Sequence, residues 1–184
     1  MATYLTFEDQ ITRAIYSKNV DAILRLCDDS SHRTSILGYK KDGMKLVHIA
    51  AQFGSVILLD KLRGFGADLK IRSDDSNIYN ANRNSTTLHI ACKYSHIDVV
   101  KYLLQTVQDC SFKNAATNQG KDKNYRNAFY YAAQSGNTEV VKCLQTLGKL
   151  DINELLPHNR TTLSVVVLEK DSKVHEFYAS VVQK

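Results

Sequence analysis

The sequence predicts an all-α fold, built as a solenoid of short helix-turn-helix units stacked side by side. Two apolar segments flank a polar turn at residues 86–104, and the same layout recurs at residues 45–62 and 127–144. Within each copy the apolar residues follow the three- and four-residue spacing of a helix face. Each helix is only about two turns long, so its stability must come from packing against the next copy.

Two fainter copies of this layout lie nearer the ends of the chain, at residues 10–27 and 161–178. A regular period of this kind is the sequence signature of a repeat architecture. We therefore expect a single domain over residues 1–184, with repeats at about 1–38, 39–80, 81–121, 122–156 and 157–184. Equivalent positions in the first helices of the five copies, at intervals of 34 to 41 residues, are Thr12, His48, His89, Tyr130 and Ser164.

Small residues recur on the first predicted helix of the three clearest copies, where they let neighbouring first helices approach closely. Gly54 and Gly136 then suit the turn between the two helices, because glycine adopts positive φ without strain. The second helix of residues 86–104 carries its apolar face on Val99, Val100, Leu103 and Leu104. The small pairs of the first helices are Ala50 and Ala51, Ala91 and Cys92, and Ala132 and Ala133.

Several of these positions match a known pattern in phase. Residues 86–96 read T-x-L-H-x-A-x-x-x-x-H, residues 42–51 contain D-G followed by H-x-A-A, and residues 136–144 read GNTEVVKCL. The chain resembles the ankyrin-repeat family, whose pattern includes T-P-L-H, A-A-x-x-G-H and E-V-V. It departs from that pattern by lacking the proline and by carrying Tyr130 and Ser164 in place of the histidine. The long insertions and degenerate repeats also loosely resemble those of bacterial or viral ankyrin effectors.

Composition agrees with one intracellular domain. The 184 residues are 43% hydrophobic and 23% charged, and no low-complexity or single-charge linker divides them. The opening MATYLTFEDQ lacks the apolar segment of a secretory signal, and no apolar run is long enough to span a membrane. We therefore expect a cytoplasmic protein without membrane association, in which the cysteines are reduced thiols: Cys27, Cys92, Cys110 and Cys143.

Three features resemble parts of enzymes, but none predicts catalysis. Residues 115–122, AATNQGKD, approach a phosphate-binding loop, yet Asp122 replaces the hydroxyl that would bind Mg²⁺ and no apolar strand precedes the loop. The resemblance implies that His48 and His89 form hydrogen bonds between repeats rather than bind a metal. Cys92 shares a helix face with His89, but the repeat pattern buries its thiol, which opposes ionisation. We expect no catalytic residue, no metal site and no cofactor.

Two polar, asparagine-rich insertions, residues 70–84 and 108–127, separate the second helix of one repeat from the first helix of the next. The resemblance implies that such insertions project as hairpin fingers beside a concave surface that binds a protein partner. Long loops in compact domains are often functional, which favours contact with a partner over a solvated spacer.

The resemblance also implies which residues contact the partner, because the hairpin tips and the last residues of each first helix line the concave side. Phe53 and Tyr94 occupy equivalent positions and are expected to be exposed anchors, since aromatic and arginine side chains are common at the centres of interfaces. The first and last repeats would add Tyr16 and Arg160. The predicted contact residues are Lys41, Met44, Gln52, Phe53, Arg83, Ser85, Lys93, Tyr94, Lys123, Arg126 and Gln134.

This row of residues is basic, and the formal net charge of the chain is +5. We therefore expect a monomer that binds an acidic protein surface, acting as a scaffold, an adaptor or an occluding inhibitor. Nucleic-acid binding is an alternative, although acidic residues interrupt the basic positions and no basic tract is sustained. A further alternative is the targeting domain of a larger enzyme or of a secreted effector.

Overall fold

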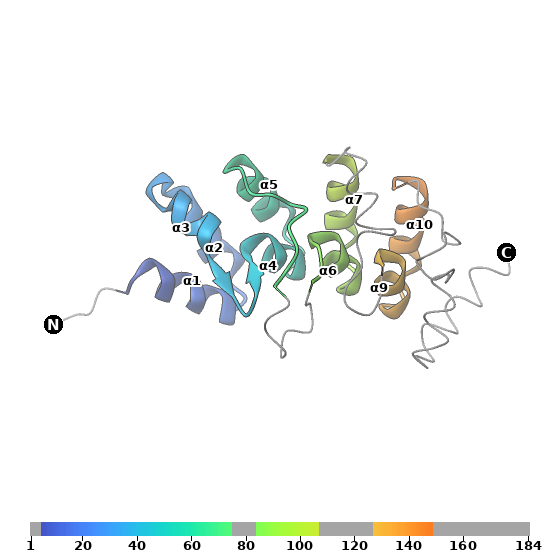
Figure 1. Ribbon diagram of the computed structural model, residues 1–184, viewed down its shortest axis with the longest axis horizontal. Helices are drawn as coiled ribbons and strands as arrows, with labels where there is room; N and C mark the ends of the chain where they lie inside the picture. The colour runs from blue at the N-terminus through green and yellow to red at the C-terminus, as the bar shows by residue number, and fades with distance from the viewer. Residues whose placement is uncertain (1–4, 75–83, 107–126, 149–184) are drawn as a thin grey trace, which may run out of the picture.

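The structure is a computed structural model, and it describes residues 5–74, 84–106 and 127–148. Within these residues, helices follow one another in antiparallel pairs along an elongated array, with α1 and α10 at opposite ends (Figure 1). This arrangement confirms the predicted all-α solenoid. The pairs are α1 Phe7–Tyr16 with α2 Val20–Asp28, α4 Leu46–Gln52 with α5 Val56–Gly64, α6 Thr87–Lys93 with α7 Ile97–Thr106, and α9 Ala128–Gln134 with α10 Thr138–Thr146.

The helices form two layers. The first helices of the pairs make up one layer, in which α4 packs on α6 and α6 packs on α9. The second helices make up the other, in which α2, α5, α7 and α10 contact one another in that order (Figure 1). Each unit therefore contacts only its neighbours along the array, as expected of a solenoid.

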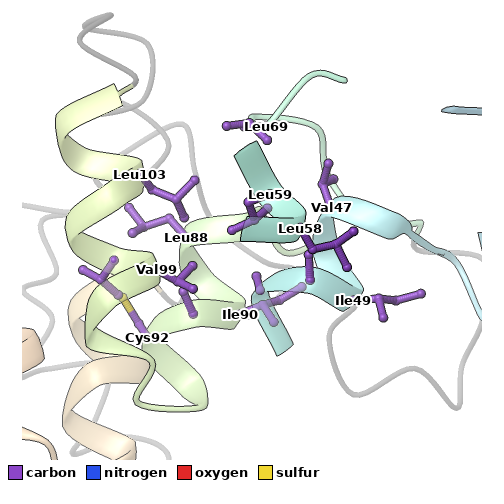
Figure 2. Close-up of a cluster of buried hydrophobic side chains, with 14 of the residues drawn as sticks. Val47, Ile49, Leu58, Leu59, Leu69, Leu88, Ile90, Cys92, Val99 and Leu103 are labelled. Carbon is purple, nitrogen blue, oxygen red and sulfur yellow. The ribbon is translucent and has the colours of Figure 1, made fainter. Parts of the chain in front are cut away.

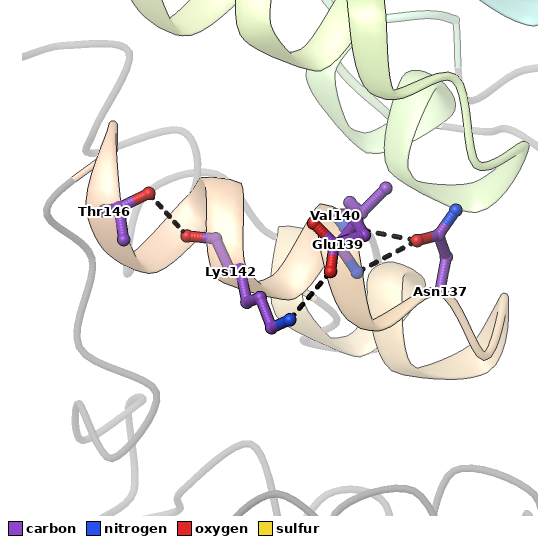
Figure 3. Close-up of polar contacts among 5 residues, drawn as sticks. All are labelled: Asn137, Glu139, Val140, Lys142 and Thr146. Atoms are coloured by element: carbon purple, nitrogen blue, oxygen red, sulfur yellow. Dashed lines mark hydrogen bonds and ion pairs between the residues drawn. The ribbon is translucent and has the colours of Figure 1, made fainter.

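Side-chain caps set where most of these helices begin. On α10, the Asn137 side-chain oxygen accepts hydrogen bonds from the backbone N–H groups of Glu139 and Val140, at 3.0 and 3.3 Å (Figure 3). Lys142 then pairs with Glu139 one turn along, and the Thr146 hydroxyl donates to the Lys142 carbonyl at 2.7 Å. Such caps satisfy N–H groups that have no partner inside the helix. Equivalent side-chain caps are Thr6, Asn19, Ser55, Thr86 and Asn127.

The turn between the two helices of a pair requires a residue with positive φ. Gly54 and Gly136 take φ values of 73° and 70°, as predicted. The equivalent residues of the other two described pairs are not glycine, because Lys18 and Ser95 take φ values of 52° and 60°. A side chain in this conformation costs roughly 1–2 kcal/mol, so these two turns are less favourable than the glycine turns.

The apolar core runs between the two layers. Side chains of α4, α5, α6 and α7 form one cluster, in which Leu58, Leu59, Ile90 and Val99 are each 0% exposed (Figure 2). The predicted small pairs of α4, α6 and α9 are buried at 0 to 1% exposure, which allows these helices to lie close together. Three of the cysteines are free and buried, as predicted, namely Cys27, Cys92 and Cys143, and Cys110 lies outside the described residues.

A helical segment between the first and second pairs was not predicted. It consists of a 3₁₀ turn η1, Ser30–His32, followed by α3, Arg33–Gly38. The Arg33 guanidinium holds α3 against the end of α5, where its Nε and Nη2 atoms donate to the Phe65 carbonyl at 3.1 and 2.8 Å.

A short hairpin follows α3, formed by β1 Lys40–Lys41 and β2 Met44–Lys45. Its turn residues Asp42 and Gly43 take φ values of 50° and 79°, as the favoured two-residue hairpin turns require. In the antiparallel register Lys40 pairs with Lys45 and Lys41 pairs with Met44. Since side chains alternate along a strand, these two pairs lie on opposite faces of the hairpin.

The predicted fingers lie mostly outside the described residues, but the base of the first one is defined. The backbone N–H of Ser73 donates to the Ser85 carbonyl at 2.9 Å, and Arg72 forms a β-bridge with Thr86. Asp74 donates its backbone N–H to the Gly43 carbonyl at 2.7 Å, which connects this base to the β1–β2 hairpin. The second insertion, residues 108–127, and the fifth repeat, residues 157–184, fall almost wholly outside what the structure describes.

Candidate functional site

The predicted contact residues of the helices lie where the first helix of each pair ends. Gln52, Lys93 and Gln134 are the last residues of α4, α6 and α9, and Tyr16 is the last residue of α1. Because the first helices stack in one layer and end at equivalent positions, these side chains form a row along the array. Tyr16 is 70% exposed, so a large aromatic ring is open to solvent at the first position of the row.

Tyr94, the residue after α6, is 39% exposed and is held by contacts to the preceding repeat. Gln52 donates from its side-chain nitrogen to the Tyr94 hydroxyl at 3.3 Å. The His96 ring stacks on the Tyr94 ring with 6.4 Å between centroids and 14° between planes. His96 Nε2 lies 2.9 Å from the Gln52 carbonyl oxygen, which can only accept, so Nε2 carries the proton. These contacts fix the direction of Tyr94 and join two repeats.

His96 occupies the space above Gly54. A Cβ atom at Gly54 would lie 2.5 Å from His96 Nδ1, closer than such atoms approach. The glycine therefore serves two purposes, allowing the positive φ of the turn and leaving room for the imidazole that supports Tyr94. The sequence motif identified His96 as a repeat position but not as a support for Tyr94.

Two lysines of the row lie against tyrosine rings. Lys41 Nζ lies 5.0 Å from the centre of the Tyr16 ring, and its hydrogen bond to Tyr16 raises the pKa of the lysine. Lys93 Nζ lies 5.9 Å from the ring centres of both Tyr94 and Tyr131. Cation–π contacts of this kind hold an ammonium group in place without neutralising its charge. The row therefore presents positioned cations beside aromatic surface.

The other predicted contact residues differ in exposure. Gln134 is exposed, whereas Met44 and Phe53 are partly buried and pack against the core, so Phe53 is less open than expected. The expectation that Ser85 is open to a partner is corrected. Ser85 is only 1% exposed, and its backbone N–H donates to the Ser73 hydroxyl at 2.9 Å in the base of the first finger. Four further predicted residues lie outside the described part of the chain: Arg83, Lys123, Arg126 and Arg160.

The two motif histidines are buried and have structural partners. His48 Nδ1 accepts from the Lys45 backbone N–H at 3.1 Å, and Nε2 donates to the Ile71 carbonyl at 2.9 Å. Burial lowers the pKa of His48 to about 4. His89 Nδ1 accepts from the Thr86 backbone N–H at 3.1 Å, and burial lowers its pKa to about 3. Both side chains are therefore neutral at pH 7 and stabilise the fold.

The thiols of Cys27 and Cys92 are not activated. Burial raises the pKa of Cys27 to about 11 and raises the pKa of Cys92 still further. His89 Nδ1 is bonded to Thr86 and the buried Nε2 has no hydrogen-bond partner, so His89 is not hydrogen-bonded to the Cys92 thiol as a base would be. Among the described residues, no group of three or more His, Cys, Asp or Glu side chains could hold a metal ion. The segment 115–122 lies outside these residues.

A family model for ankyrin repeats (3 copies) matches residues 11–114 and 47–155. The chain belongs to the ankyrin-repeat family. Ankyrin repeats are generally modules for protein–protein interaction. The comparison with curated proteins gave no match. In the part of this ankyrin chain that the structure describes, no helix has the length and apolar character needed to cross a membrane.

Proposed function

We propose that this ankyrin chain is a non-enzymatic module that binds an acidic protein surface along the row of residues at the ends of its first helices. In this proposal the chain forms one domain of the five repeats predicted above and acts as a monomer in the cytoplasm. Its role is that of a scaffold, an adaptor or an occluding inhibitor. The main observation in support is the pair of exposed tyrosines, Tyr16 and Tyr94, each with a lysine against its ring.

The chemistry of this row suits an acidic partner. Aromatic side chains bury much apolar area at a low cost in conformational entropy, and they are frequent anchors of interfaces. The charges of Lys41 and Lys93 would attract a partner's carboxylates over a distance and so speed association. Gln52 supplies a side-chain amide between the two lysine–tyrosine clusters. We include Phe53 as a secondary contact and leave Ser85 out because it is buried.

Capture of partners from a cell lysate tests this proposal. The Tyr16→Ala/Tyr94→Ala variant should lose a protein that the wild type retains, because truncating an interface anchor costs roughly 2 kcal/mol or more. The control is Ile57→Ala on α5, because Ile57 is 71% exposed but lies on the second-helix layer. Equal capture by all three proteins would rule out this surface as the binding site.

Nucleic-acid binding is a second candidate, supported by the net charge of +5. A Lys41→Glu/Lys93→Glu variant distinguishes the two functions. For a protein partner it should mainly slow association at low salt, whereas for nucleic acid it should reduce binding to any duplex or single strand. A gel-shift titration of the wild type at two salt concentrations is the measurement. Strong binding that falls steeply with salt and is unaffected by Tyr94→Ala would favour nucleic acid over protein.

A further inference from the structure

A cavity of about 230 Å³ lies between α3, the start of α4 and the loop that follows α5. Most of its wall is apolar, formed by Ile36 and Leu37 of α3, Leu46 at the start of α4, Leu62 of α5 and Ile71 beyond the loop. The unpredicted helix α3 thus forms one side of the cavity.

The position of α3 and the small residues of the adjoining loop together define the cavity. Arg33 bonds twice to the Phe65 carbonyl and so anchors the start of α3 to the end of α5. Gly66 and Ala67 form the neighbouring wall, and Gly66 has a φ of 90°, which favours glycine at this position. A larger side chain at Ala67 would take up part of the volume.

Two charged residues line the cavity, and they differ in what they contact. The Asp68 carboxylate accepts a hydrogen bond from the Lys70 backbone N–H at 2.8 Å. Lys45 has no carboxylate partner among the described residues. The ion pairs found there are formed by His32, Lys40, Lys61 and Lys142. Its positive charge contributes to the lowered pKa of His48, the residue bonded to the Ile71 carbonyl. The cavity lining therefore holds one ammonium and one carboxylate. The carboxylate of Asp68 accepts the Lys70 N–H, whereas the ammonium of Lys45 forms no ion pair with a described residue.

This cavity is separate from the proposed protein-binding row. Lys41 and Met44 form one cross-strand pair of the β1–β2 hairpin, and Lys40 and Lys45 form the next, so the two pairs face opposite sides. Lys45 lines the cavity, whereas Lys41 lies against Tyr16.

We propose that the cavity binds a small aliphatic carboxylate, with a branched alkyl group of leucine size against Ile36, Leu62 and Ile71 and its carboxylate paired with Lys45. An apolar cavity of about 150 Å³ is large enough for benzene, so this one has room for such a group and its carboxylate. A charge-assisted hydrogen bond from an ammonium to a carboxylate is stronger than one between neutral groups. The carboxylate could belong to a free acid or to the end of a peptide, and both have the same chemistry.

The test is a titration of the ¹⁵N-labelled full chain, followed by amide chemical shifts, with three probes of one shape. These are isovalerate, isoamyl alcohol and isoamylamine at pH 7. Isovalerate should give saturable shifts at Gly66, Ala67 and Ile71 and should bind about tenfold more tightly than the alcohol, the size of effect expected for one charge-assisted contact. The amine should bind more weakly than the alcohol.

Three variants make the test specific. Lys45→Met should bring the affinity for isovalerate down to that for the alcohol and leave the alcohol unchanged. Ala67→Leu should reduce binding of both. Lys41→Met, the control on the other face of the hairpin, should change neither. N-acetyl-leucine added as a fourth probe identifies the source, because tighter binding than isovalerate indicates a peptide terminus and weaker binding indicates a free acid.

The proposal is overturned if none of the probes gives saturable shifts at the cavity. It is also overturned if the alcohol or the amine binds as tightly as isovalerate, or if Lys45→Met leaves the affinity for isovalerate unchanged. These measurements do not depend on protein capture by the row of residues at the ends of the first helices. A negative result for the cavity therefore leaves the proposed function untouched, and a negative result for protein capture leaves the cavity proposal untouched.

Discussion

The junction between the first and second repeats differs from the junction between the second and third in what joins the units. At the first, polar contacts reach across from α1, α2 and α3: Thr12 to the Tyr39 hydroxyl at 2.9 Å, Asp28 to Lys61, and Arg33 to Phe65. At the second, α4 lies directly against α6, their small residues are buried, and His96 bonds across to the Gln52 carbonyl.

This difference has a thermodynamic consequence. The first repeat also buries Ile11, Ile23 and Ile36 in the common core, and each fully buried aliphatic side chain contributes about 1.5–3 kcal/mol. The exposed ion pair at its junction adds only roughly 0–1 kcal/mol. The stability of a solenoid is approximately a sum over its repeats and the junctions between them. We therefore expect the first repeat to open more readily than the second and third. The substitutions below measure what individual side chains contribute on either side of this comparison.

The largest effect is expected from Leu59→Ala in the central cluster. Leu59 is 0% exposed, so its truncation should lower the free energy of unfolding by roughly 2–5 kcal/mol, measured by urea denaturation. Ile23→Ala on α2 removes a side chain that is also 0% exposed. It should speed hydrogen exchange in α1 and α2 while α6 and α7 keep their protection. Uniform acceleration along the whole array would contradict the difference between the junctions.

Acid should weaken the second repeat through His48. Its pKa is lowered from 6.5 to about 4 in the folded chain, so the unfolded chain binds more protons below pH 6.5. Stability that is fully present above pH 6.5 should fall by about 3 kcal/mol as the pH drops to 4, at roughly 1.4 kcal/mol per pKa unit. His89, with a pKa of about 3, should add to the loss in the same direction.

Urea denaturation of His48→Gln at pH 7, 5 and 4 measures this contribution. The variant should lose less stability over this interval than the wild type does. Identical slopes for the two proteins would mean that His48 is not the source of the pH dependence.

Gly54 and Gly136 form a matched pair of turn glycines. Both have φ near 70°, so alanine at either should cost about 1 kcal/mol from backbone strain alone. Only Gly54 faces a neighbour, because a Cβ there would meet His96 while one at Gly136 meets nothing within 4 Å. Gly54→Ala should therefore cost about 2 kcal/mol or more in urea denaturation. If the two variants were equally stable, His96 would not be packed in the turn as described.

The smallest effect is expected at the first junction, from Lys61→Met. Lys61 pairs with Asp28, whose side chain is 68% exposed, so water and salt screen the interaction. The free energy of unfolding should change by about 0.5 kcal/mol or less, and the difference should shrink further at high salt. A loss comparable to that of Leu59→Ala would show that this exposed ion pair makes the first junction much stronger than we expect.

Much of the fold could be predicted because it depends on local patterns that recur in phase. The helix pairs follow from the spacing of apolar residues, and the close layer of first helices follows from the small pair in each copy. The sequence also predicts that Gly54 and Gly136 lie in the turns between paired helices, because glycine adopts positive φ without strain. Ser95 could also be identified as a turn residue by its place in the repeat, although only the backbone geometry assigns it a positive φ.

The sequence alone determined the family, the helical layers and the identity of the row that ends with Gln52, Lys93 and Gln134, since these depend on residue type and period. Tertiary structure decided how open each side chain is, because exposure depends on chain segments distant in sequence. Ser85 is buried and bonded to Ser73, and Tyr94 is supported by Gln52 and His96. The helix α3 and the cavity beside it also required the folded chain, because a six-residue helix has little stability of its own and is held by the contact between Arg33 and Phe65.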